Sequence, residues 1–293
     1  MLSIDPQTTP IPKLHQYLVG AVAPRPIAFV STISADGIPN LAPYSFFNVF
    51  GSNPPVAAFS SNRRVRGNTT KDTLSNVKAT GEAVINIVNY AIVHQMALTS
   101  VDYAPEVNEF EKAGLTPIPS DRVKPFRVKE SPVQMECIVK DIITIGEGGG
   151  GANIVICEIV KIHISESILD ADGDIDPFRA DLMARMGKAW YCRANGANVF
   201  PIVQPFEKIG VGFDQLPQSV KQSPVLTGKQ LWQLAAVEKV PDRDLDIMDD
   251  HDFQSTLSDN SDDRVERLHT LASEFLNEGK VEKAWQVLLA ASE

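Results

Sequence analysis

Alternation of apolar and polar residues predicts β-strands along much of the chain. Period-two runs flank the turn pair Asp36-Gly37, which is typical of a β-hairpin. Other strand-like runs are short and apolar or long and rich in β-branched residues. They occupy residues 56–60, 83–89, 133–145 and 154–165. The last two are joined by the glycine-rich segment 146–151 and are expected to form a second hairpin with a loose tip.

Helical signals interrupt these strands. Gly81 follows the segment 71–79, and glycine commonly stands just past the end of a helix. The start of this helix, at residues 69–72, leaves backbone N–H groups free to meet an anion. Three more short helices are expected, the second of them closed by Gly114. They span residues 92–99, 106–113 and 179–186.

The C-terminal part of the chain changes in character. Residues 242–263 are rich in aspartate and poor in large apolar side chains, which is typical of a flexible linker. Helices with an apolar stripe follow at 264–277 and 280–291, and this hairpin resembles one tetratricopeptide-like unit. We expect this hairpin either to pack on the preceding domain or on a second copy of the chain, or to bind a protein partner. We therefore divide the chain into a domain with its extension at residues 1–240, an acidic linker at 241–263 and a helical hairpin at 264–293.

Composition narrows the class of protein. The chain has 293 residues, 43% of them hydrophobic, a formal charge of −10 and a pI near 5.0. A nucleic-acid binder is disfavoured, because phosphate contacts need a clustered basic surface. Without a leader-like or membrane-spanning apolar run, a soluble, cytoplasmic protein with no membrane partner is expected. Three widely spaced cysteines suggest neither a disulfide framework nor a zinc site, and buried thiols are expected.

Two local patterns imitate known sites. Residues 146–151 satisfy G-x-G-x-x-G, but a strand-like sequence follows where a dinucleotide fingerprint needs a helix. Alternating aspartates at 170–176 suggest a calcium loop, yet Ile175 stands where its sharp turn needs glycine. Motifs of hydrolases and zinc proteases are absent from the sequence. We therefore predict neither a metal site nor a dinucleotide-binding fold.

Polar residues cluster where one strand ends and the first strong helix begins. Hydroxyls, cations and helix-end amides at such a place suit an anion such as a phosphate. The anion-binding group comprises Ser60, Ser61, Arg64, Lys71 and Thr73. An ordinary surface loop with a capped helix is the alternative interpretation.

Several segments, in their order along the chain, are similar to the flavin reductase-like family of FMN-binding split barrels. They are PRPIAFVST, NLAPYSFFNVFGSNPP, KDT, GEAVINIV, IVKIHISESILD and MGKAWYCR. FDQLP followed by VLTG resembles an extension found in one branch of that family. The resemblance implies a mainly β fold, a Greek-key split barrel with peripheral helices, to which this chain adds a C-terminal helical hairpin. It also implies FMN as cofactor, NADH or NADPH as transient reductant, and a homodimer with the flavin at its interface.

The same resemblance extends the candidate site. It implies that the anion-binding group holds the FMN phosphate. Thr32, Ser45 and Asn48 are candidates for the flavin ring or the ribityl hydroxyls, although alternation separates Ser45 from Asn48 and leaves open which face lines the slot. His163 matches a histidine that faces the flavin region in relatives, and a structural role for this lone strand histidine is the alternative. Arg25, held extended between two prolines, contacts phosphate or pairs with an acid.

The reaction implied by the resemblance is hydride transfer from NADH or NADPH to FMN. Because that chemistry belongs to the flavin, no catalytic residue is assigned. The alternative is a non-catalytic FMN-binding electron carrier of the flavoredoxin kind, whose C-terminal hairpin docks a protein partner.

Overall fold

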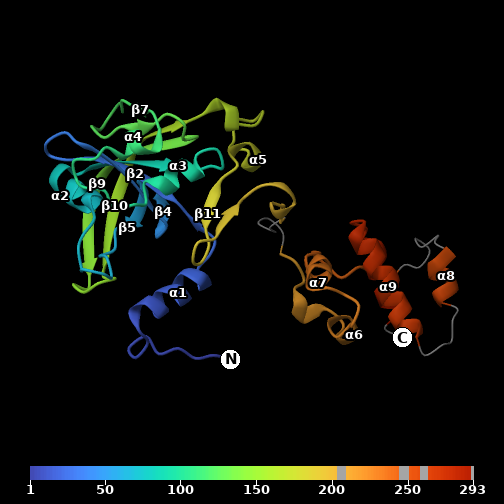
Figure 1. The fold of residues 1–293 in the computed structure, drawn as a ribbon. Coiled ribbons are helices and arrows are strands. Elements are labelled where there is room, and N and C mark those ends of the chain that lie inside the picture. Colours follow the sequence, from blue (N-terminus) through green and yellow to red (C-terminus); the bar gives the residue numbers. More distant parts are fainter. Residues whose placement is uncertain (203–208, 244–250, 258–262, 292–293) are drawn as a thin grey trace. The chain divides into compact units, whose positions relative to one another are not determined.

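The computed structural model describes residues 1–202, 209–243, 251–257 and 263–291. Contacts divide the chain into two units, residues 1–200 and residues 201–293, each with its own core (Figure 1). In the part of the chain that the structure describes, none of the helices combines the length and the apolar character needed to span a bilayer.

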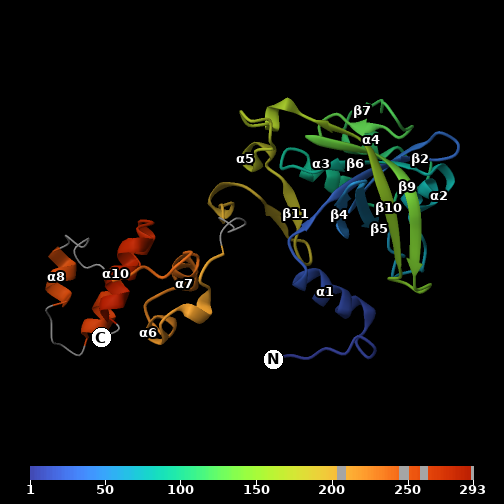
Figure 2. The ribbon, with the colours of Figure 1, turned by 180° about the vertical axis from the view of Figure 1, so that it is seen from behind.

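The first unit is built around an antiparallel sheet of seven strands, in the order β3-β2-β6-β9-β10-β5-β4. Asp36-Gly37 lies in the β2–β3 turn, and the glycine-rich segment joins β9 to β10, so both predicted hairpins are confirmed. Figure 2 shows β9 and β10 running side by side. The strands are β2 (Ala28–Ile33), β3 (Pro39–Tyr44), β4 (Phe47–Ser52), β5 (Pro55–Ser60), β6 (Glu82–Ile87), β9 (Val133–Ile145) and β10 (Ala152–Ile164).

The two edge strands of this sheet, β3 and β4, are held together by a very short connection in the chain. β3 and β4 stand at opposite ends of the strand order, yet only Ser45 and Phe46 separate them in sequence. So short a link cannot cross the width of a flat sheet, so the sheet curls into a barrel that is split between β3 and β4. At the link, the N–H of Ser60 donates to the carbonyl of Phe46 at 2.8 Å. The predicted mainly β barrel with peripheral helices is confirmed.

Helices cover the two cores of this unit. α2 (Asp72–Thr80) buries Leu74 and Val77 against Phe59 and its neighbours on one face of the sheet. α3 (Val93–Leu98) and α4 (Glu109–Ala113) pack Met96 and Phe110 on a second core. α1 (Ile11–Ala21) precedes the first strand. The predicted helices at 71–79, 92–99 and 106–113 are thus confirmed, although the last begins only at residue 109, where the side chain of Asn108 caps it.

The predicted helix at residues 179–186 is wrong. α5 (Pro177–Ala180) stops at Asp181, which adopts the left-handed conformation with φ at 49°. The chain then forms β11 (Met183–Arg185), the middle strand of a small sheet with β1 (Arg25–Pro26) and β12 (Tyr191–Arg193). Pairing with two neighbours satisfies the backbone here, a tertiary effect that local periodicity does not reveal. The remaining short elements are β7 (Pro117–Ile118), β8 (Arg127–Val128) and 3-10 turns at Glu166–Ile168 and Gly196–Asn198.

The second unit consists of helices and connecting loops in its described residues. Its elements are a 3-10 turn at Phe213–Gln215, α6 (Gln218–Lys221), α7 (Gly228–Ala235), α8 (His251–Leu257), α9 (Arg264–Asn277) and α10 (Val281–Ala291). α9 and α10 are the predicted helical hairpin. Trp285 is fully buried in the single apolar core that these helices share.

The division of the chain differs from the one expected from the sequence. That division places residues 213–240 with the barrel, whereas Leu216 and Leu234 pack in the core of the helical unit. Phe253, inside the expected linker, is also fully buried in this core. A two-helix hairpin cannot bury its own apolar stripe, and the preceding helices supply the missing surface. The parts of the expected linker at 244–250 and 258–262 lie outside the described residues.

Candidate functional site

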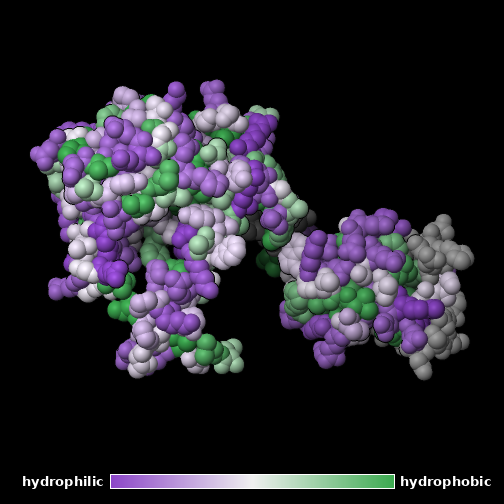
Figure 3. Space-filling model, in the orientation of Figure 1, coloured by the Kyte–Doolittle hydropathy of each residue, from purple (hydrophilic) through white to green (hydrophobic). Residues whose placement is uncertain are grey.

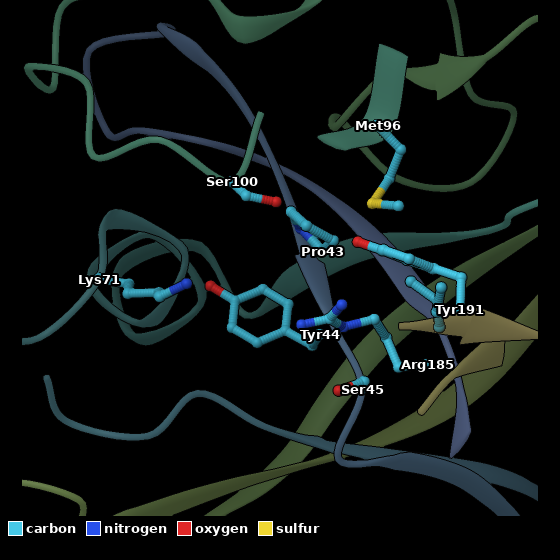
Figure 4. A pocket seen from close by; sticks show the side chains of 9 residues that line it. Pro43, Tyr44, Ser45, Lys71, Met96, Ser100, Arg185 and Tyr191 are labelled. Carbon is cyan, nitrogen blue, oxygen red and sulfur yellow. The ribbon is translucent and has the colours of Figure 1, made fainter. Parts of the chain in front are cut away.

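A cavity of about 200 Å³ lies on the first unit where four elements meet. The end of β3, the start of α2, the α3 segment and the small sheet form its walls (Figure 4). Its lining residues are Ile27, Pro43, Tyr44, Ser45, Lys71, Met96, Ser100, Arg185 and Tyr191. This lining contains two cations and no carboxylate, on a chain whose formal charge is −10. The cavity therefore suits an anionic ligand.

Of the two cations in the cavity lining, Lys71 is the one at a helix N-terminus. It stands immediately before α2, whose first amides receive no side-chain cap. Its Nζ lies 5.1 Å from the centroid of the Tyr44 ring, and it forms no ion pair within the described residues. Burial lowers the pKa of Lys71 below that of an exposed lysine. An unpaired, partly desolvated ammonium beside free helix amides is a binding point for a phosphate.

Two buried hydroxyls lie near one another, and one of them, that of Tyr44, belongs to the ring beside this cation. The Tyr44 hydroxyl and Ser61 Oγ are shielded from solvent, and neither has a hydrogen-bond partner in the described structure. Burial raises the pKa of Tyr44 to about 12, and the hydroxyls of Thr73 and Ser61 offset part of that rise without reaching hydrogen-bonding geometry. Tyr44 is therefore a neutral donor at physiological pH. Buried polar groups are rarely left unpaired, so the Tyr44 hydroxyl, which lines the cavity, is available to a ligand.

Arg185 and Tyr191 form the opposite wall. The guanidinium carbon of Arg185 lies 4.5 Å from the centroid of the Tyr191 ring, and its Nη2 donates to the Lys188 carbonyl at 2.9 Å. Arg185 also stands directly opposite Arg25 in the β1–β11 register. Sequence reasoning missed Arg185 because it lies in the segment predicted as helix. Met183, two residues earlier on the same strand, is buried, as alternation along a strand would place it on the side of Arg185.

Arg64 lies beside the cavity, in an adjoining hollow that Lys71 also lines. Its guanidinium makes two bonds to the carboxylate of Asp102, at 2.9 and 2.7 Å, and donates to the Thr70 carbonyl at 2.5 Å. The bond to Arg64 lowers the pKa of Asp102. Arg64 therefore already has an anionic partner, whereas Lys71 has none among the described residues.

Thr32 and Thr73 belong to a buried hydrogen-bond network behind the cavity. Asn40 donates through Nδ2 to Thr32 Oγ1 at 3.0 Å and to Thr73 Oγ1 at 2.9 Å. Asn76 donates to Thr32 Oγ1 at 3.1 Å. The network ties β2 and β3 to α2 and so fixes the helix start, but neither threonine lines the cavity.

The other strand candidates lie at different places. Ser45 lines the cavity, as expected if it faces a ligand. Asn48 is exposed on the edge strand β4 and accepts from the N–H of Val49 at 2.8 Å. Ser60 donates to Asn62 Oδ1 at 2.5 Å. The alternation assumed through these residues breaks at the Ser45-Phe46 link, so Tyr44 and Ser45 both reach the cavity.

Arg25 is buried and binds backbone rather than an acid. Its Nη1 donates to the carbonyls of Val19 and Val22, and its Nη2 donates to that of Met186 at 3.3 Å. It thereby satisfies carbonyls at the C-terminal end of α1 and fastens this helix to the turn after β11. A phosphate role for Arg25 would compete with these bonds.

His163 is not brought to the cavity within one chain. Its Nε2 lies 2.6 Å from Oε1 of the fully buried Glu136, whose carboxylate also accepts from the N–H groups of Asp121 and Arg122. These backbone bonds and His163 hold the pKa of Glu136 below its usual value against the effect of burial. Asp121, Glu136 and His163 could offer ligand atoms within 4.8 Å of one another, but Lys161 pairs with Asp121. Each group is thus accounted for by structural bonds.

Residues 20–178, just over half of the chain, match the sequence profile of the flavin reductase like domain. An uncharacterized protein of Aquifex aeolicus is 40% identical over 183 residues, which make up 62% of this chain and 91% of that protein. Nitrilotriacetate monooxygenase component B from Bacillus cereus has a TM-score of 0.64 and 31% identity, covering 69% of this chain and 98% of its own. A putative flavin reductase with a split barrel domain from Shewanella frigidimarina has a TM-score of 0.58 and 25% identity, over 67% and 96% respectively. The chain belongs to the flavin reductase-like family.

Proposed function

We propose that this protein is an FMN-binding oxidoreductase that takes hydride from NADH or NADPH. The observation that carries the proposal is the cavity of a flavin reductase-like chain in which Lys71 and Tyr44 present unpaired polar groups, with the unpaired Ser61 hydroxyl buried beside Tyr44. FMN offers a phosphate to the cation and hydroxyls to the buried donors. Of the cations that line the described cavity, Lys71 alone stands beside a helix end, which fits a single terminal phosphate, and we propose FMN rather than FAD for this reason.

Each part of the cavity has a task in this proposal. Lys71 and the first amides of α2 bind the phosphate, and Tyr44 donates to a ribityl or ring oxygen. Ile27, Pro43 and Met96 supply apolar surface for the ring system. Bound flavin supplies the redox chemistry by accepting hydride from the nicotinamide. The chain itself binds and orients the flavin, and no general acid or base is needed.

A second copy of the chain would complete the site. The cavity of about 200 Å³ is smaller than the ~300–1,000 Å³ of pockets that enclose a whole small ligand. Leu18, Phe50 and Trp190 expose apolar side chains on the same unit, and hydrophobic areas interrupt the polar surface over and beside α1 (Figure 3). We therefore propose a homodimer in which the partner covers the rest of the flavin.

The test is the visible spectrum of the purified protein, followed by anaerobic addition of NADH and NADPH in turn. We expect a yellow protein, or one that becomes yellow with FMN, whose absorbance near 450 nm is bleached by at least one of the two reductants. FAD should bind more weakly than FMN. A protein that binds neither flavin contradicts the proposal.

A second candidate is an FMN-containing electron carrier without reductase activity of its own. The family match ends before the helical unit begins, so residues 201–293 are available to dock a protein partner. Steady-state oxidation of NADH or NADPH with added FMN separates the two candidates, because a pure carrier does not turn over. NADH and NADPH are electron donors of the cytoplasm, and we propose that the protein acts there.

A further inference from the structure

Arg185 is a second cation in the cavity, and binding of the FMN phosphate leaves it without a role. Its side chain is half-buried on β11, and Figure 4 shows it pointing into the cavity from the side opposite Lys71. The Tyr191 ring and the bond to the Lys188 carbonyl hold the guanidinium in place. A guanidinium has five N–H donors. Within the described part of the chain, Arg185 makes no ion pair, so most of these donors remain for a ligand.

The charges around Arg185 are unfavourable in the absence of an anion. Arg185 stands opposite Arg25 on paired strands, an arrangement that destabilises a sheet when both residues carry the same charge. Lys71 lines the same cavity, and no carboxylate does. A ligand with negative charge at two separate places would offset both costs.

On the basis of the proposed function, we propose that Arg185 binds the pyrimidine edge of the flavin. In this position it favours the reduced form of the flavin over the oxidised form. Hydride transfer breaks a C–H bond of the dihydronicotinamide and forms an N–H bond on the flavin, so the reductant becomes NAD(P)⁺. The flavin gains two electrons and one proton. Its ring then carries one more negative charge than before, shared over the N–C=O edge of the pyrimidine.

The two cations differ in what they can discriminate. A guanidinium presents two parallel donors and a permanent charge to such an N–C=O edge. Its attraction for the ring therefore increases on reduction. Lys71 meets the phosphate, whose charge is the same in both redox states. Arg185 thus sets the reduction potential, while Lys71 sets the affinity for both forms alike.

The test compares wild type with Arg185→Gln, Arg185→Met and Arg185→Lys. Arg193→Gln is the matched control, because Arg193 lies on the same small sheet, pairs with Asp181 and does not line the cavity. Fluorescence titration gives the Kd for oxidised FMN, and the midpoint potential of bound FMN gives the Kd for the reduced form. In the neutral variants we expect about a tenfold selective loss for reduced FMN, equal to a potential about 30 mV lower. Arg185→Lys keeps the charge but loses the paired donors, so its potential should lie between those of wild type and the neutral variants, whereas Arg193→Gln should stay near wild type.

Each other outcome is decisive. An unchanged potential in both neutral variants overturns the proposal, and so does an equal loss of oxidised and reduced FMN, which makes Arg185 a general flavin ligand. A change confined to the KM for NADH or NADPH assigns Arg185 to the dinucleotide instead. Circular dichroism detects a variant that fails to fold, and the other neutral variant then still tests the proposal. If wild type itself binds no flavin, the proposed function fails rather than this inference alone.

Discussion

Hydrogen bonding within the chain decides which polar residues remain available to a ligand. Arg25, Arg64 and Thr73 all have the chemistry of phosphate ligands, but each is engaged by the fold. Lys71 and Tyr44 lie beside them with no hydrogen-bond or ion-pair partner in the described structure. The difference arises from neighbours that are distant in sequence, such as Asp102 for Arg64.

Replacing Lys71 by alanine should weaken FMN binding by about 1–2 kcal/mol, the value of a charge-assisted hydrogen bond. Lys78→Ala is the control, because Lys78 is exposed on the same helix at its opposite end. Fluorescence quenching of FMN measures both dissociation constants. Equal affinity in wild type and Lys71→Ala removes Lys71 from the site.

The lowered pKa of Lys71 predicts a pH dependence of FMN affinity. Phosphate binding needs the ammonium form, so affinity is fully present below this pKa and falls as pH rises through it. Burial moves the pKa of Lys71 below the ordinary lysine value. The affinity for FMN should therefore begin to fall at a lower pH than it would if an exposed lysine bound the phosphate. Titrations from pH 7 upward should show this fall in wild type but not in Lys71→Arg, whose charge persists. Parallel curves for the two proteins would contradict the assignment.

At the scale of elements, the cavity depends on how α1, the small sheet and the start of α2 are fastened to the barrel. Arg25 joins the end of α1 to the turn after β11, and a Cβ on Gly187 in that turn would come within 3.2 Å of Gly20 in α1. The network around Asn40 fastens α2 in the same way. The wall that carries Arg185 is therefore held by contacts outside the cavity.

Arg25→Met should lower the free energy of unfolding of the first unit by about 2–3 kcal/mol, the cost of losing charged hydrogen bonds and leaving carbonyls unpaired. Arg66→Met is the control, because Arg66 is exposed and lies outside these contacts. Urea unfolding followed by far-UV circular dichroism measures both variants. A loss of similar size in the two variants would show that Arg25 contributes no more than a surface arginine.

For the whole molecule, the place where the chain is cut should decide whether the barrel stays soluble. A chain ending at Phe200 keeps both cores of the first unit and should fold and bind FMN. A chain cut near Asp250 keeps Leu216 and Leu234 but lacks α9 and α10, which cover them. We therefore expect the longer fragment to aggregate and the shorter one to remain in solution. Size-exclusion chromatography with detection at 450 nm compares them, and the reverse order would contradict the division into these units.

The proposed dimer gives a further prediction for the whole molecule. Light scattering at micromolar concentration should report about twice the chain mass of 32.0 kDa. Replacing the exposed Trp190 by glutamate should shift the protein toward monomer and weaken FMN binding together, because the partner completes the site. A monomeric wild type that binds FMN tightly would refute the shared site.

The sequence by itself determined the barrel strands, the two hairpins, most helices and the family, because these depend on local periodicity, turn residues such as Asp36-Gly37 and segments in a fixed order. It also proposed Lys71 and Ser45, which lie close to the recognisable strand ends and which the structure places in the cavity lining. Only the tertiary structure decided that Arg25 binds backbone carbonyls, that Thr32 joins a buried hydrogen-bond network, that His163 pairs with Glu136, and that residues 213–240 pack with the C-terminal helices. It also revealed Arg185, since β11 exists through pairing with strands far away in sequence. A side chain's partners come from such long-range packing, and no local pattern encodes them.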